Sequence, residues 1–172
     1  MAGDLRIAVI GQAAFGESVL DALVERGEDV VAVFCSPDLE SRPADPIKQA
    51  AQKHSAPVFQ FRRLRSQEAI DAFGSLNADL CVMAFVTDIV PDAILEAPSK
   101  GTIQYHPSLL PKHRGPSSIN WPIIQGEART GLSIFWPDDG LDTGPILLQK
   151  EMKIEPDDTL GTLYFDKLFP MG

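Results

Sequence analysis

Residues 5–16, LRIAVIGQAAFG, decide the fold, because an apolar run there ends in glycine and leads into a second apolar pattern. A continuous run such as Leu5–Ile10 is typical of a strand buried on both faces of a parallel sheet. The next residues, Phe15–Arg26, place apolar side chains on one helical face, and Gly27 follows as a stop. A second buried strand is expected at Val30–Phe34. The order strand, helix, strand indicates an α/β protein.

The same alternation continues to the end of the chain. Further strands are expected at Pro57–Phe59, Leu80–Ala84, Thr102–Tyr105, Leu132–Trp136 and Ile146–Ile154. Further helices are expected at Pro46–His54, Ser66–Phe73, Pro91–Glu96, Ser117–Gln125 and Thr159–Leu168. No helix separates the last two strands, so that pair is expected to be antiparallel. The sequence therefore predicts a Rossmann-like, mostly parallel sheet with helices on both faces, whose ligands bind at the carboxyl ends of the strands.

Composition narrows the class of protein further. The 172 residues, 44% of them hydrophobic, suit one globular domain. The net charge of -9 argues against a surface built to hold nucleic acid. Cys35 and Cys81 lie in apolar runs, which predicts buried free thiols and a cytoplasmic location. We expect neither a secretory signal nor a membrane span, because no apolar run is long enough.

The loop Gly11–Gly16 lies between the first strand and the first helix, where backbone N–H groups can bind a phosphate. It departs from the dinucleotide-binding pattern, since Ala13 stands where the second glycine should be. Asp38 also follows a turn rather than the second strand itself. The alternative, that the glycines only permit a tight turn and close helix packing, is the better supported of the two.

A polar stretch from Gln104 to Gly115 follows the strand that begins at Thr102. Side chains alternate along a strand, so Gln104 and His106 are expected on the same face. Pro107 and Pro111 stiffen the loop behind the histidine. Spacing alone leaves a catalytic histidine and a core histidine that bonds a backbone carbonyl equally open.

A second polar cluster, residues 137–144 with sequence PDDGLDTG, follows the predicted strand at Leu132–Trp136. Its spacing is not that of a calcium loop, so we expect no metal. Asp142, which comes 36 residues after His106, could orient the imidazole and keep it basic. The alternative, a solvated turn rich in turn-forming residues, stays open at this point.

These stretches resemble the folate-dependent formyltransferase family. The resemblance is carried by His106–Pro111 (HPSLLP), by Arg114-Gly115 and by Leu141–Gly144 (LDTG), and it runs from Arg6 to the last residue. It implies the formyltransferase fold, 10-formyltetrahydrofolate as formyl donor and a catalytic role for His106, Asp142 and Gln104. It also implies that residues 1–172 are a catalytic domain cut at its carboxyl end, without the small β-barrel that follows in the family.

Within the family, the longer match is to the amino-terminal hydrolase domain of 10-formyltetrahydrofolate dehydrogenase. The matching segments include Ala44–Pro46, Ser118–Trp121 and Leu168–Pro170. The transferases carry Asn where this chain has Gln104, which favours hydrolysis or an atypical acceptor. The short, nearly neutral stretch Ser36–Pro43 speaks against tRNA as acceptor. Two alternatives remain: a methionyl-tRNA or amino-sugar N-formyltransferase, and a non-catalytic folate- or nucleotide-binding module.

The family pattern also implies where the substrate is held. Ser108 and Arg114 are expected to meet the acceptor or the glutamate tail of the folate. The expected partners are thus a small-molecule folate and either water or an amine, with neither nucleic acid nor membrane. Eight residues are expected to hold the pterin ring: Val86, Thr87, Asp88, Ile89, Asp138, Asp139, Gly140 and Leu141.

Overall fold

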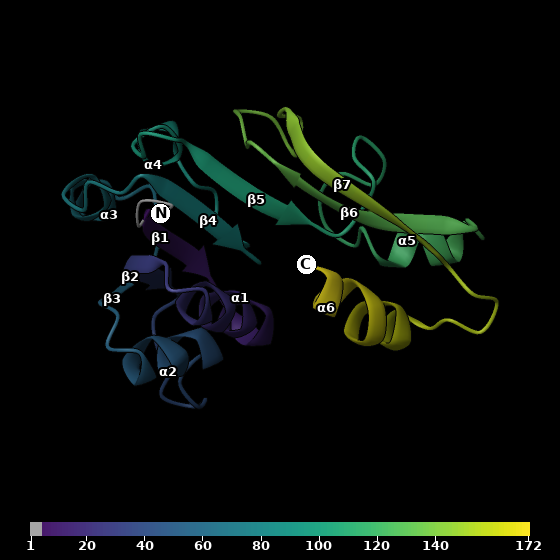
Figure 1. Cartoon of the computed structure of the whole chain (residues 1–172), viewed down its shortest axis with the longest axis horizontal. Helices are drawn as coiled ribbons and strands as arrows, with labels where there is room; N and C mark the ends of the chain where they lie inside the picture. The colour runs from purple at the N-terminus through teal and green to yellow at the C-terminus, as the bar shows by residue number, and fades with distance from the viewer. Residues whose placement is uncertain (1–4) are drawn as a thin grey trace. The chain divides into compact units, whose positions relative to one another are not determined.

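The computed structural model describes residues 5–172, whose helices and strands are labelled in Figure 1. They form two compact units, residues 5–103 and residues 104–172. In the first unit four parallel strands have the order β3-β2-β1-β4. Its strands are β1 (Arg6–Gly11), β2 (Asp29–Cys35), β3 (Val58–Gln60) and β4 (Leu80–Ala84). Its helices are α1 (Ala13–Glu25), α2 (Pro46–Lys53), α3 (Gln67–Gly74) and α4 (Asp92–Leu95).

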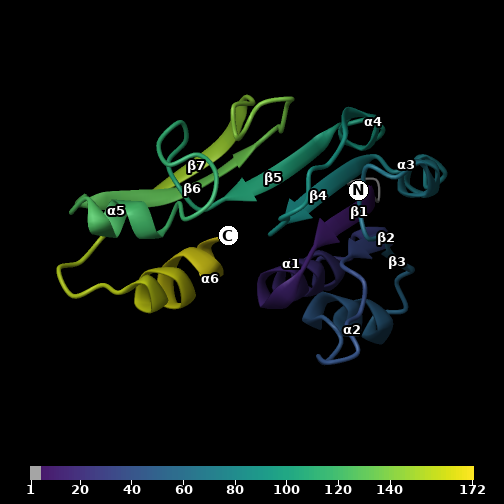
Figure 2. The same ribbon diagram turned by 180° about the vertical axis from the view of Figure 1, so that it is seen from behind.

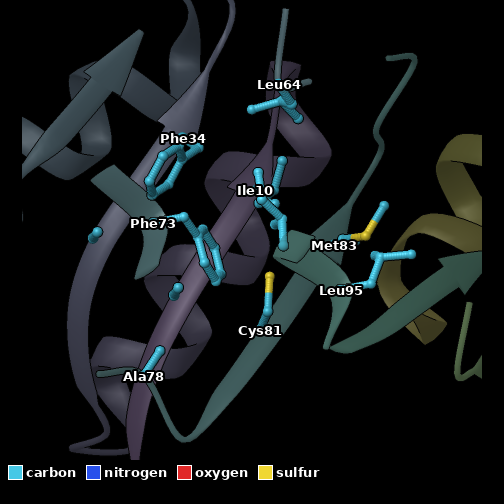
Figure 3. Packing of buried hydrophobic residues seen from close by; sticks show 11 residues of the cluster. Ile10, Phe34, Leu64, Phe73, Ala78, Cys81, Met83 and Leu95 are labelled. Carbon is cyan, nitrogen blue, oxygen red and sulfur yellow. The ribbon is translucent and has the colours of Figure 1, made fainter. Parts of the chain in front are cut away.

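Helices cover both faces of this four-stranded sheet because the strands are apolar on both sides. On one face Val9 and Val33 pack with Leu20 of α1 and Ile47 of α2. The other face packs against α3 and α4, and Figure 3 shows its cluster, in which Phe34 of β2 lies 5.3 Å from the ring of Phe73 of α3. The strands are therefore buried from two sides and need no alternation of polar residues.

The second unit is built on antiparallel pairing in the order β5-β6-β7. One face of β6 is covered by Leu163 and Leu168, which pack against Leu132 with Ile119 and Ile123 beside them. Figure 2 shows α5 and α6 on the same side of the β6–β7 pair. The elements are β5 (Thr102–His106, which starts in the first unit), α5 (Asn120–Ile124), β6 (Arg129–Phe135), β7 (Ile146–Lys153), the wide helical segment η1 (Thr162–Leu168) and α6 (Phe169–Met171).

The predicted α/β fold is confirmed, and so is the antiparallel pairing of the last two strands. Two helices differ from expectation. The helix expected at Ser117–Gln125 is α-helical only over Asn120–Ile124, because Ser117 adopts a left-handed backbone with φ of 64°. The helix expected at Thr159–Leu168 is helical from Leu160 onward, but it has wide turns over Thr162–Leu168. These turns precede Pro170, a residue that cannot donate to the carbonyl four residues earlier.

No helix within residues 5–172 is both long enough and apolar enough to cross a membrane.

Candidate active site

His106 ends β5, and its position follows from strand pairing. It lies opposite Ser133 of β6, while Gln104 lies opposite Phe135. Residues directly opposite each other in an antiparallel pair project to the same face, and that face alternates along each strand. Gln104 and His106 therefore share one face, as the sequence predicted, and the other face carries the apolar cluster around Leu132.

The imidazole of His106 is buried, with 5% of the residue exposed, and both of its nitrogens face oxygen atoms. Nε2 lies 2.9 Å from the backbone carbonyl of His113, and Nδ1 lies 3.4 Å from Oδ2 of Asp142. The ring of Phe135 packs edge-on at 6.5 Å between centroids. Nε2 can therefore donate a hydrogen bond to the carbonyl, while Nδ1 lies within ion-pair distance of the carboxylate.

Asp142 is held in place by its own loop. Its backbone is left-handed, with φ of 50°, and its Oδ2 accepts a hydrogen bond of 2.7 Å from the N–H of Gly115. Gly144, two residues on, has no room for a side chain, since a Cβ there would lie 1.7 Å from the carbonyl oxygen of Trp136. The Asp-Thr-Gly sequence thus fixes the carboxylate against His106, and the contact that spacing left open is present in the structure.

The preceding turn is exposed over Asp138–Leu141. Asp138 accepts hydrogen bonds from the hydroxyl of Thr143 at 2.5 Å and from the N–H of Gly140 at 3.1 Å. The Thr143 hydroxyl, with smaller help from Gly140 and the charge of Arg114, lowers the pKa of the Asp138 carboxyl below its usual value. Leu141 is 65% exposed. The turn thus presents backbone groups and one apolar side chain to solvent.

The basic residues of the loop after His106 differ in what they contact. His113 and Lys112 both contact Glu127, at 2.8 and 3.3 Å, and therefore support the loop. Arg114 is exposed. Ser108 is fully buried and donates to the carbonyl of Lys112, so its hydroxyl stabilises the loop and does not face a ligand.

In the first unit, Val86, Thr87 and Asp88 line a cavity of about 270 Å³ at the carboxyl ends of β1, β2 and β4. The hydroxyl of Thr87 accepts from Nε2 of Gln12 at 3.3 Å. Asp88 accepts from the N–H groups of Leu64 and Ile89, each at 2.9 Å, and so shapes the loop. This is the end of a parallel sheet where ligands of such folds bind.

Cys35 also lines this cavity. Burial, reinforced by the negative charge of Asp45, raises the pKa of its thiol to about 11. Because the thiolate is the reactive form, Cys35 is a poor nucleophile at neutral pH.

At the glycine loop after β1, the carboxylate of Asp45 lies against the start of α1. Asp45 Oδ1 accepts from the N–H of Ala13 at 2.8 Å, where a bound phosphate would otherwise accept. A Cβ at Gly11 would lie 2.6 Å from the carbonyl oxygen of Ala84. Close packing accounts for this glycine, as the favoured interpretation of the sequence held.

Within the described residues, no three His, Cys, Asp or Glu side chains are grouped so that they could hold a metal ion.

Sequence reasoning missed Ser133 and Gln149, whose side chains bond the loop that follows His106. The signal was present for Ser133, a lone polar residue in the apolar strand LSIFW. The sequence around Gln149 held no such signal, because polar residues are common on an edge strand.

The pattern of the formyl transferase family matches residues 5–168. The chain belongs to this family. The predicted resemblance is therefore confirmed.

Curated relatives of this formyl transferase chain include the mitochondrial 10-formyltetrahydrofolate dehydrogenase of Mus musculus and the cytosolic one of Homo sapiens. Each is 47% identical over 98% of this chain. The chain spans 19% of the length of either relative. A methionyl-tRNA formyltransferase of Trichlorobacter lovleyi is 38% identical over 97% of this chain, which spans 54% of that protein.

Among solved structures, the phosphoribosylglycinamide formyltransferase of Bacillus halodurans superposes with a TM-score of 0.80 at 26% identity. The match covers 94% of this chain and 86% of that one. The formyltransferase fold expected from the sequence is thus confirmed.

Proposed function

We propose that this chain removes the formyl group of 10-formyltetrahydrofolate, with water as the first acceptor to test and an amine as the second. The contact between His106 and Asp142 carries the proposal, since it pairs a buried proton donor with a carboxylate whose side chain is only 10% exposed. Family membership and the names of the dehydrogenase relatives support the folate as donor.

The chemistry needs one proton removed and one supplied. Water attacks the formyl carbon and gives a proton to Asp142, and the carbonyl oxygen becomes an oxyanion that the His106 imidazolium stabilises. When the bond from carbon to N10 breaks, His106 gives its proton to N10, and tetrahydrofolate and formic acid are released. Asp142 then gives its proton to solvent water, and Nε2 of His106 takes one up from solvent, so both groups return to their starting states.

The hydrogen bond from Nε2 to the His113 carbonyl sets a condition for this sequence of steps. That nitrogen can donate to the folate only if the carbonyl moves away or the ring turns. The loop that carries His113 therefore takes part in the proposed reaction.

Residues 86–89 and residues 138–141 stay proposed as folate contacts, and Gln104 as an amide donor toward the formyl oxygen. Arg114, exposed on its loop, is proposed to meet the glutamate tail or the acceptor. The free thiols and the name of the cytosolic relative support a cytoplasmic location, and the net charge of -9 supports a small acceptor over tRNA.

The test is to follow tetrahydrofolate release from 10-formyltetrahydrofolate, first in water alone and then with amines. We expect release in the wild type, and a loss of about 10²- to 10⁴-fold in kcat for His106→Ala and for Asp142→Ala, the usual contribution of a positioned acid or base. Lys100→Ala, a change at an exposed residue of the first unit, serves as the control. If both site variants fold and turn over within a few-fold of the wild type, the assignment is wrong.

A further inference from the structure

A hydrogen-bond network beneath the loop that follows His106 has no part in the chemistry above. We propose that Ser133 and Gln149 are positioning residues, which fix this loop, residues 107–115, so that the His113 carbonyl stays against the His106 ring. The inference rests on the proposed function only for its kinetic consequences, because the network is defined by contacts alone.

Strand pairing places three side chains in one row. His106 of β5 lies opposite Ser133 of β6, and Ser133 lies opposite Gln149 of β7. All three therefore belong to the same face of the antiparallel sheet, opposite the apolar cluster around Leu132. In this row, Ser133 is the one residue between His106 and Gln149 of the edge strand β7.

Ser133 is fully buried, and its hydroxyl is used completely. It donates to the carbonyl of Ser108 at 2.7 Å, and it accepts from the N–H of Leu110 at 3.1 Å and from Nε2 of Gln149 at 2.9 Å. A hydroxyl has one proton to donate and two lone pairs to accept with, so no bonding capacity is left over. Such a saturated group fixes its partners in one arrangement.

Gln149 completes the network from the edge strand. The Nε2 of this residue also donates to the carbonyl of Leu110, at 2.7 Å. An amide nitrogen carries two protons, and both are engaged. The N–H and the carbonyl of Leu110 are thus both held by side chains of β6 and β7, although Leu110 belongs to neither strand.

Two hydrogen bonds link the residues held by this network to Lys112, the neighbour of His113. The hydroxyl of Ser108 donates to the carbonyl of Lys112 at 2.7 Å, and the N–H of Lys112 donates to the carbonyl of Leu109 at 3.0 Å. The next residue is His113, whose carbonyl accepts from His106. Loosening the network therefore lets the loop and the His106 ring take up other positions. Fewer molecules then hold the ring where it can turn toward the folate, so kcat should fall more than substrate binding.

The experiment compares two network variants with two matched controls. Gln149→Glu keeps the shape of the side chain but removes both donors, and Gln125→Glu makes the same chemical change at an exposed residue of the same unit. Ser133→Ala removes the saturated hydroxyl. Thr130→Val removes a buried hydroxyl of the same strand that has no hydrogen-bond partner within residues 5–172.

We expect kcat for tetrahydrofolate release to fall at least about tenfold in Ser133→Ala, and less in Gln149→Glu, whose site borders solvent, with KM changed less than threefold. The pH midpoint of kcat should shift in both variants, and Ser133→Thr should restore part of the activity. Both controls should match the wild type. A purely structural role would leave the pH midpoint in place.

A second measurement reports on the network without turnover. The ring ¹⁵N signals of His106, followed by NMR over a pH titration, should move in Ser133→Ala and Gln149→Glu and stay in place in both controls. If the wild type releases no tetrahydrofolate, the proposed function fails while this titration still decides the inference. Unchanged ring signals and an unchanged pH midpoint in folded network variants overturn it. If Ser133→Ala does not fold, Gln149→Glu decides alone.

Discussion

Asp45 shows how one residue can determine what a loop binds. A single carboxylate oxygen accepts from Ala13 at the start of α1 and from Ile47 at the start of α2. We expect Asp45→Ala to lower the free energy of unfolding by about 1–2 kcal/mol, the upper part of the range for a lost helix cap. Ser66→Ala, which removes a cap with one longer bond of 3.3 Å, should cost less in the same urea titration. An equal or smaller loss for Asp45→Ala would mean that only one of its bonds matters.

At the scale of the element, β6 combines a saturated hydroxyl with one that bonds nothing within residues 5–172. Ser133 belongs to the first kind and Thr130 to the second, and both are buried. A buried hydroxyl without a partner costs roughly 1–3 kcal/mol, so we expect Thr130→Val to raise the free energy of unfolding by up to about 1 kcal/mol, while Ser133→Ala lowers it. Denaturation with urea measures both. A loss of stability in Thr130→Val would show that a water molecule bonds the native hydroxyl.

At the scale of the whole molecule, several carboxyl groups have a pKa below the usual value. Lys167 lowers the pKa of Asp158, the backbone N–H of Arg6 lowers that of Asp79, and the Thr143 hydroxyl lowers that of Asp138. Their stabilisation is complete above the unfolded-state pKa near 4 and is lost as the pH falls through the lower folded-state values. The urea midpoint should therefore be lower at pH 3 than at pH 6. Asp158→Asn should make this dependence shallower, and an unchanged slope would exclude Asp158 as a contributor.

Much of this protein follows from local pattern. The apolar run before Gly11 predicts a buried strand because only a strand covered on two sides can be apolar throughout. The absence of a helix before Ile146 predicts an antiparallel pair. The apolar spacing predicts a helix from Ser117, but the left-handed backbone of Ser117 delays its start. Apolar spacing does not report the backbone angle of one polar residue.

The candidate site also has some features that follow from the sequence and others that depend on the tertiary structure. The sequence by itself determined the fold class, the family and the strand that carries Gln104 and His106, because each depends on local pattern or on motif. Only the tertiary structure decided that Asp142 meets His106, that Asp45 occupies the start of α1, and that Ser133 and Gln149 hold the loop after His106. These contacts join residues far apart in the chain. Their geometry depends on strand register and loop closure, which spacing along a sequence does not fix.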